Sequence, residues 1–216
     1  MLARVHTNIK LLVLLGCSLL LGCARMPRVP TLVAPKRQLI VEFALPAPAS
    51  PNYFYFVAFD NDGDPANGPV PVTAWSDAMG SGWGIISQRN VRVPAYVVYN
   101  QGRFSQYLND QYKGPPFQAQ VLDGGRRIRL TLDLDLITTS VSLLSMNIIT
   151  VDTEFPPSPP GVRVDYDGLG PFPGNDYVSF PLANSTLRNL GDETEGDCPE
   201  PTLDIVDWSA EVRISP

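Results

Sequence analysis

Three aspartates at alternating positions form the clearest ion-binding pattern in the chain: Asp60, Asp62 and Asp64. Oxygen ligands two residues apart in a curled loop can converge on a hard cation such as Ca²⁺, and Gly63 provides a sharp turn between them. The twelfth position of an EF-hand needs a bidentate acid, but here it is Pro71. A helix–loop–helix site is excluded. Two interpretations stay open, a calcium-binding β-loop and an ordinary hairpin turn whose side chains bond the backbone.

Aromatic side chains follow in a Gly- and Trp-rich stretch, residues 69–92, and in the strand after it. Trp75, Trp83, Tyr96 and Tyr99 could together form a platform for a sugar or a peptide, because each ring combines a large apolar area with a polar group. A long stretch without clear periodicity is often functional. The alternative is a loop folded over the edge of the fold with its tryptophans buried.

Paired carboxylates are the catalytic arrangement that this composition could most readily offer. Asp133 and Asp135 form one pair, and Asp204 and Asp207 form another. Glycoside hydrolysis needs two facing carboxyl groups at a set separation. Asp133 and Asp135 are expected on the polar face of one strand, which suits a solvated surface at least as well. We therefore expect no enzyme and no catalytic residue, with a carboxylate-dependent glycoside hydrolase as a distant alternative.

Histidine and cysteine usage narrows the chemistry further. The only histidine, His6, lies in the first 22 residues, which are expected to be removed. The remaining chain would then lack both a Ser-His-Asp triad and an imidazole metal ligand. Cys17 would leave with the same segment, and Cys23 is expected to be modified. Cys198 is therefore left as a single thiol, which we expect to be buried.

The N-terminus has the layout of a secretory signal peptide, with a charged start and an apolar run too short to span a bilayer stably. Its end, Leu19-Leu20-Leu21-Gly22-Cys23, resembles the bacterial lipobox. The resemblance implies cleavage after Gly22 and lipidation of Cys23. We expect a signal peptide over residues 1–22, a lipidated tether over 23–37 and one domain over 38–216. The alternative is an uncleaved anchor helix.

The charge of the expected mature chain limits its partners. Removal of Arg4 and Lys10 leaves 14 basic against 22 acidic residues, a net charge near −8. Such a surface repels nucleic acid, so no nucleic-acid partner is expected. Attachment is expected through the lipid, on the outside of the cell membrane. The residue after Cys23 is Ala24 rather than the Asp that resembles an inner-membrane retention signal, which favours the outer membrane in a cell with two membranes.

Short apolar runs separated by turn formers predict an all-β fold, an antiparallel sandwich of about eight or nine strands. The run 52–59 is aromatic on both faces, so it should be a central strand covered on both sides. Residues 118–122 and 126–134 flank Asp123-Gly124-Gly125 and predict a hairpin, and 93–100 with 103–107 predict another. Further strands are expected at 39–45, 143–151, 177–182 and 203–214.

The order of these features resembles the DOMON-like superfamily, which includes the family-nine carbohydrate-binding modules. The likeness covers residues 50–152 and rests on three parts: the aromatic strand entering the Asp-rich turn, the Leu/Asp strand 129–137, and the run 145–152. It implies a β-sandwich that binds a sugar or haem, often with calcium. The expected lack of histidine disfavours haem.

The expected function is therefore a non-catalytic, lipid-anchored binding module outside the cytoplasm that recognises a glycan or an envelope polymer. The expectation is no cofactor, with Ca²⁺ at Asp60, Asp62 and Asp64 as the alternative. The alternative is a structural or assembly lipoprotein that docks a protein partner through the same loop or an exposed edge strand.

Overall fold

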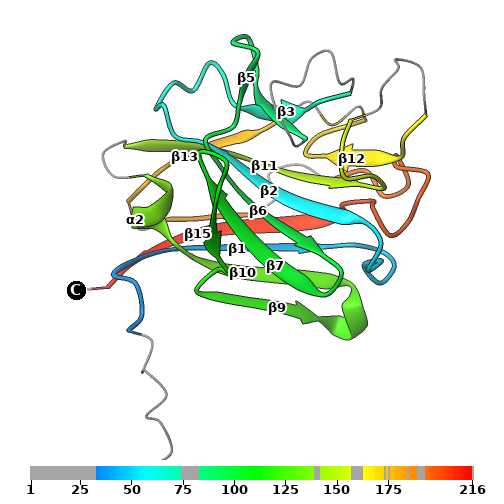
Figure 1. Ribbon diagram of the computed structural model, residues 1–216, viewed down its shortest axis with the longest axis horizontal. Helices are drawn as coiled ribbons and strands as arrows, with labels where there is room; N and C mark the ends of the chain where they lie inside the picture. The colour runs from blue at the N-terminus through cyan, green and yellow to red at the C-terminus, as the bar shows by residue number, and fades with distance from the viewer. Residues whose placement is uncertain are drawn as a thin grey trace, which may run out of the picture. The chain divides into compact units, whose positions relative to one another are not determined.

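Strands dominate the computed structural model, which describes residues 33–73, 83–138, 142–156, 163–172, 174, 176–183, 185–188 and 193–215. Residues 34–216 cluster as one unit, and its strands form antiparallel sheets (Figure 1). The all-β class and the antiparallel sandwich are confirmed. The described residues contain fifteen strands rather than eight or nine, because several are only two to four residues long, too short to show a period in sequence.

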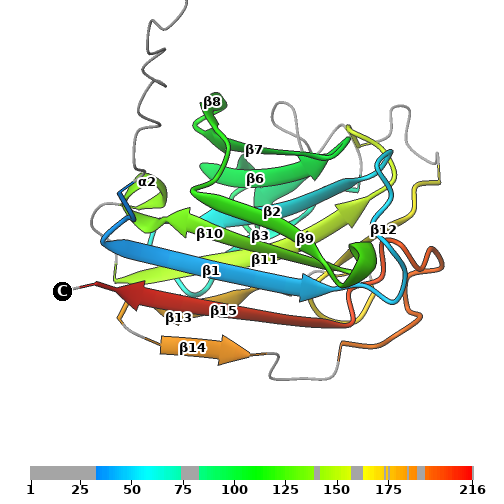
Figure 2. The ribbon, with the colours of Figure 1, turned by 90° about the horizontal axis from the view of Figure 1, so that it is seen from below.

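The first sheet has five strands in the order β14-β15-β1-β10-β9 (Figure 2). Their bounds are β1 Arg37–Ala44, β9 Gln118–Leu122, β10 Arg127–Asp133, β14 Ser185–Arg188 and β15 Asp207–Ile214. β9 and β10 form the predicted hairpin, with Arg127 opposite Leu122. β1 is the central strand, and it pairs along its whole length with the last strand of the chain.

The second sheet has seven strands, in the order β12-β11-β2-β6-β7-β8 with β13 also paired to β11. Their bounds are β2 Phe54–Asp60, β6 Ala95–Asn100, β7 Arg103–Leu108, β8 Gln111–Gly114, β11 Leu143–Val151, β12 Tyr166–Gly168 and β13 Val178–Pro181. β6 and β7 form the second predicted hairpin, with Asn100 opposite Arg103. β2 lies between β11 and β6, the central position expected for it.

The stretch 69–92 is not structureless where it is described. It contains β3 (Pro69–Pro71), β4 (Gly84–Ile86) and β5 (Val91–Arg92), which form a small third sheet over the second (Figure 1). Two short helical turns complete the described elements, η3 (Asp123–Gly125) and α2 (Leu134–Ile137). Among the described residues, no helix is long and apolar enough to cross a membrane.

The main core lies between the two large sheets and follows period two. Each contributing strand sends every second side chain inward, so these residues are at most 2% exposed. They are Leu39, Val41 and Phe43 of β1, Tyr55, Val57 and Phe59 of β2, Ile128, Leu130 and Leu132 of β10, and Leu144, Met146 and Ile148 of β11.

A second apolar cluster covers the other face of the second sheet. Phe56 and Ala58 of β2 pack there with side chains of β11 and of the 83–93 segment. Its members are Phe56, Ala58, Trp83, Ile86, Val93, Ile149, Val151 and Tyr166. β2 is therefore covered on both faces, as its aromatic run predicts. The cluster covers only part of this face.

Candidate functional site

The uncovered part of the outer face of the second sheet carries a groove of about 300 Å³. Because side chains alternate along a strand, the groove is lined by the outward-facing residues of β6 and β7 and by the first two outward-facing residues of β2. Segment 154–155 contributes the remaining part of the wall. The lining residues are Phe54, Phe56, Tyr96, Val98, Asn100, Gln101, Arg103, Ser105, Tyr107, Glu154 and Phe155.

The floor of the groove is aromatic. The rings of Phe54 and Phe56 are stacked with centroids 6.3 Å apart, and those of Tyr96 and Tyr107 are stacked at 4.8 Å. Arg92 donates from Nη2 to the hydroxyl of Tyr96 at 3.0 Å, which fixes that ring. Burial, as the first cause, raises the pKa of Tyr96, so its hydroxyl stays protonated at neutral pH.

Polar groups lie around this floor. Asn100 donates from Nδ2 to the carbonyl of Tyr53 at 2.9 Å, so its amide is held in place. Arg103 and Glu154 add one charge of each sign to the lining. Flat apolar rings beside amide, guanidinium and carboxylate groups match a sugar, which has an apolar face and a rim of hydroxyls.

Tyr96 and Tyr99 lie on opposite faces of β6. Tyr96 lines the groove, whereas the ring of Tyr99 packs between Tyr55 at 5.9 Å and Phe104 at 4.6 Å on the core side. Their spacing of three residues separates them, because a strand repeats every two residues. The prediction that both tyrosines serve one platform is thus corrected for Tyr99.

Trp83 is a structural residue in this fold. It is 1% exposed, its Nε1 donates to the carbonyl of Thr153 at 2.9 Å, and its ring contacts Tyr166 at 5.8 Å. A ring buried to this extent offers no face to a ligand. For Trp83 the alternative prediction, a tryptophan buried in the folded loop, is therefore the one that the structure supports. Trp75 lies outside the described residues.

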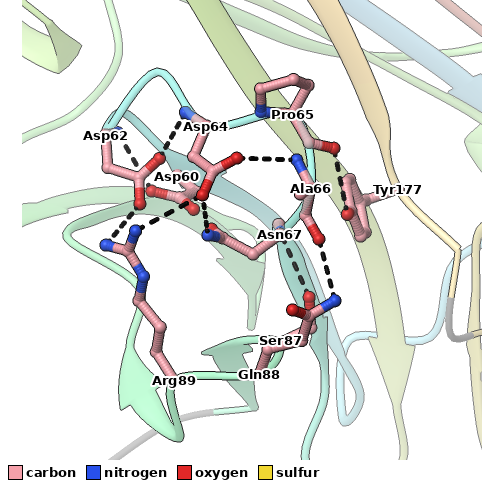
Figure 3. Close-up of polar contacts among 11 residues, drawn as sticks. Asp60, Asp62, Asp64, Pro65, Ala66, Asn67, Ser87, Gln88, Arg89 and Tyr177 are labelled. Atoms are coloured by element: carbon pink, nitrogen blue, oxygen red, sulfur yellow. Dashed lines mark hydrogen bonds and ion pairs between the residues drawn. The ribbon is translucent and has the colours of Figure 1, made fainter.

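Asp60 is the last residue of β2, and Asp62 and Asp64 lie in the loop that follows. Each of the three carboxylates accepts a hydrogen bond from a backbone N–H two residues later. This is the turn chemistry that the sequence left open as the alternative. Arg89 contacts the loop from the side, 2.7 Å from Asp62 and 3.6 Å from Asp64 (Figure 3). In the described part of the chain these three carboxylates do not form a group with one oxygen each within 4.8 Å of the others.

A different set of carboxylates does converge. One oxygen each of Asp167, Asp197 and Asp204 lies within 4.8 Å of the others. Asp167 and Asp204 are 2% and 1% exposed. Burial is the first cause that raises the pKa of both, that of Asp167 to about 7, with the neighbouring carboxylates raising them further. The sequence gives no signal for this cluster, because Asp167 is distant in sequence from Asp197 and Asp204 and no pattern joins the three.

The cluster is held by backbone donors from several segments. Asp167 accepts from the N–H of Ile205 at 2.7 Å and from that of Gly168 at 2.8 Å. Asp204 accepts a hydrogen bond from the N–H of Gly196 at 2.8 Å. Asp197 accepts one from the N–H of Phe172, which follows β12, at 3.0 Å. No basic side chain pairs with the three acids in the described part of the chain. The cluster thus joins the excursion after β12 to the segment that leads into β15.

Two pairs of carboxylates were considered for catalysis, and in neither pair do the two members face each other across a cleft. Asp133 accepts from the N–H of Asp135 at 3.0 Å and caps α2, while Asp135 pairs with Arg37 at 2.7 Å. The strand predicted to run to residue 134 therefore ends at Asp133. Asp204 belongs to the buried cluster, whereas the side chain of Asp207 is 58% exposed and lies 3.8 Å from Arg127.

Cys198 is buried, as the sequence predicts, at 2% exposure. Burial, as the first cause, raises the pKa of its thiol to about 12, and nearby carboxylates act in the same direction. A thiol this far from ionisation is a poor nucleophile. Cys23, the predicted lipidation site, lies outside the described residues.

The described residues form an antiparallel β-sandwich with an aromatic groove on one outer face and a largely buried cluster of three aspartates. Comparison of the sequence with protein-family models and curated proteins, and of the structure with solved structures, finds no match.

Proposed function

We propose that this chain is a lipid-anchored, extracytoplasmic binding module that recognises a glycan or an envelope polymer through the groove over β2, β6 and β7. The single observation behind the proposal is the composition of that groove: aromatic rings form its floor, and amides and charges surround them. Sugars bind to such surfaces by laying an apolar face on a ring while their hydroxyls meet fixed polar groups. The likeness to carbohydrate-binding modules supports the same ligand class.

The groove also favours binding over catalysis. Glycoside hydrolysis requires two carboxyl groups across the scissile bond. Glu154 is the one acid among the described residues that line the groove. The hydrolase alternative therefore needs a second acid that the described lining does not provide.

Calorimetric titration of the purified protein with a panel of envelope and plant glycans tests the proposal. Phe155→Ala removes a 41% exposed ring from the groove, and Phe172→Ala is the matched control, because its ring is 53% exposed and does not line the groove. We expect binding to weaken about tenfold in the first variant, the equivalent of about 1.4 kcal/mol, and to stay unchanged in the second. Heat in no titration, or equal loss in both variants, would refute a glycan site here.

One observation favours the alternative, a structural or assembly lipoprotein. β8 is an edge strand of the second sheet, and Tyr112 on it is 60% exposed. An outer strand presents backbone groups to which a partner strand can add. Crosslinking from position 112 in intact cells would capture a defined protein partner if this alternative holds, and would capture none if the groove alone carries the function.

A further inference from the structure

Two buried oxygens in the Asp60 loop have no hydrogen-bond donor in the described part of the chain. They are Oδ2 of Asp60 and Oδ1 of Asn67, on side chains of residues that are only 2% and 3% exposed. Buried acceptors are paired in the great majority of cases, so two such atoms in one short loop require an explanation.

The orientation of the Asn67 amide is fixed. Its Nδ2 donates to Oδ2 of Asp64 at 3.0 Å (Figure 3). A flip of the amide would place its oxygen against that carboxylate oxygen, with two acceptors facing each other. Oδ1 of Asn67 is therefore an acceptor at the acidic loop, and the loop itself supplies no proton for it.

The negative charge of the loop is only partly neutralised. Three carboxylates face one guanidinium, that of Arg89, which leaves a formal charge of −2. Arg89 pairs with Asp62 and Asp64, and its side chain is 47% exposed.

Neighbouring contacts hold this loop in shape without a ligand. Gly68 donates to Oγ of Ser87 at 3.1 Å, and Gln88 donates from Nε2 to the carbonyl of Ala66 at 3.0 Å (Figure 3). The ring of Tyr177 lies against Gly68, so close that a Cβ at this position would clash with the ring. A site held in advance loses little entropy when an ion binds.

We propose that the Asp60 loop binds a hard divalent cation, of which Ca²⁺ is the representative, through carboxylate oxygens of Asp60 and Asp64 and the amide oxygen of Asn67. All three ligands are oxygens, which is the set that such ions prefer. The cation neutralises the residual charge of −2 and gives both unpaired oxygens a partner. Arg89 already neutralises part of the negative charge of the loop, so it lowers the affinity of the loop for the divalent cation.

Thermal unfolding of the full-length protein, stripped with a chelator and then titrated with Ca²⁺ or Mg²⁺, tests this site. We expect Ca²⁺ to raise the midpoint by about 5–10 °C at a hundredfold excess over its dissociation constant. Asp60→Asn keeps an acceptor for the N–H of Asp62 and removes a ligand charge, so the shift should disappear. Arg89→Gln removes the competing cation and should tighten Ca²⁺ binding at least tenfold.

Asp197→Asn is the matched control, because it removes one charge from the other acidic cluster. The proposal requires this variant to keep the Ca²⁺ shift. Loss of the shift in Asp197→Asn with retention in Asp60→Asn would place the ion at the other cluster and overturn the assignment. A wild-type protein whose unfolding midpoint does not change with Ca²⁺ would also overturn the proposal. Arg89→Gln, at an exposed side chain, remains a test if Asp60→Asn fails to fold, because unchanged affinity in it would also overturn the proposal.

Discussion

A rise in pH from about 4 to about 7 should destabilise this fold, and the Asp167 cluster gives the reason. The carboxyl group of Asp167 has a pKa of about 7 in the folded chain and near 3.8 when unfolded, because burial among other acids penalises its charge. Between these values the folded state holds about one proton more than the unfolded state. The free energy of unfolding must therefore fall as pH rises through this window, and level off above it.

The size of the effect follows from the difference of about three pH units. At about 1.4 kcal/mol per unit, the full loss is about 4 kcal/mol, and the part between pH 5 and pH 8 is about 3 kcal/mol. Asp204 and Glu193 have raised pKa values from the same first cause, burial, and act in the same direction. The cluster titrates as a unit, so the slope belongs to the group rather than to Asp167 alone.

Urea unfolding of the purified protein in chelator, at half-unit steps from pH 5 to pH 8, measures this slope. Asp167→Asn removes the titrating group, so its unfolding free energy should vary much less with pH, whatever its absolute stability. Asp135→Asn is the control, because Asp135 is half-exposed and paired with Arg37; the wild-type slope should remain. Stability that is flat or rises over this range in the wild type would refute the reasoning.

Three more substitutions test the packing around the groove and the loops, each by urea unfolding. Trp83→Phe loses the hydrogen bond to Thr153 and leaves a cavity, so the fold should lose about 2–4 kcal/mol; a loss under about 0.5 kcal/mol would mean that Trp83 is not packed as described. Gly68→Ala places a methyl group against the ring of Tyr177 and should cost about 1–3 kcal/mol. The double variant with Tyr177→Ala should recover part of this cost, and additive costs would contradict the clash. The side chain of Asn147 is fully buried; it donates to the carbonyl of Pro69 in β3 and accepts from the N–H of Leu169 after β12. Asn147→Leu should therefore cost about 2–4 kcal/mol of unfolding free energy. A neutral result would show that these two backbone groups find other partners.

The strand pattern was predictable from the sequence where the period was long enough to see. The hairpin around Asp123-Gly124-Gly125 follows from alternation and turn chemistry, and β2 follows from its aromatic run. The short strands of the third sheet were not predictable, since two or three residues carry no period. α2 was missed for a local reason: the side chain of Asp133 caps a helical turn where alternation alone would continue the strand.

The candidate sites were predictable only in part. Tyr96 was identified from its aromatic neighbours in the sequence. The alternation of side chains along a strand already places Tyr99, three residues later, on the opposite face. The rest of the groove depends on the pairing of β2, β6 and β7, which the sequence does not state. The convergence of Asp167 with Asp204 depends on how two long excursions meet, and neither excursion has a period that could indicate it.

The pairing of β1 with β15 has a consequence for the order of folding. Arg37 lies opposite Ile214, so the central strand of the first sheet gains one of its two neighbours only from the last strand of the chain. That sheet cannot close during synthesis until residues 207–214 have left the ribosome. Contacts of such long sequence separation form slowly, which keeps the chain open for longer after synthesis. The proposed lipid-anchored function requires export of the unfolded chain, and this late closure lengthens the interval in which the chain is still unfolded.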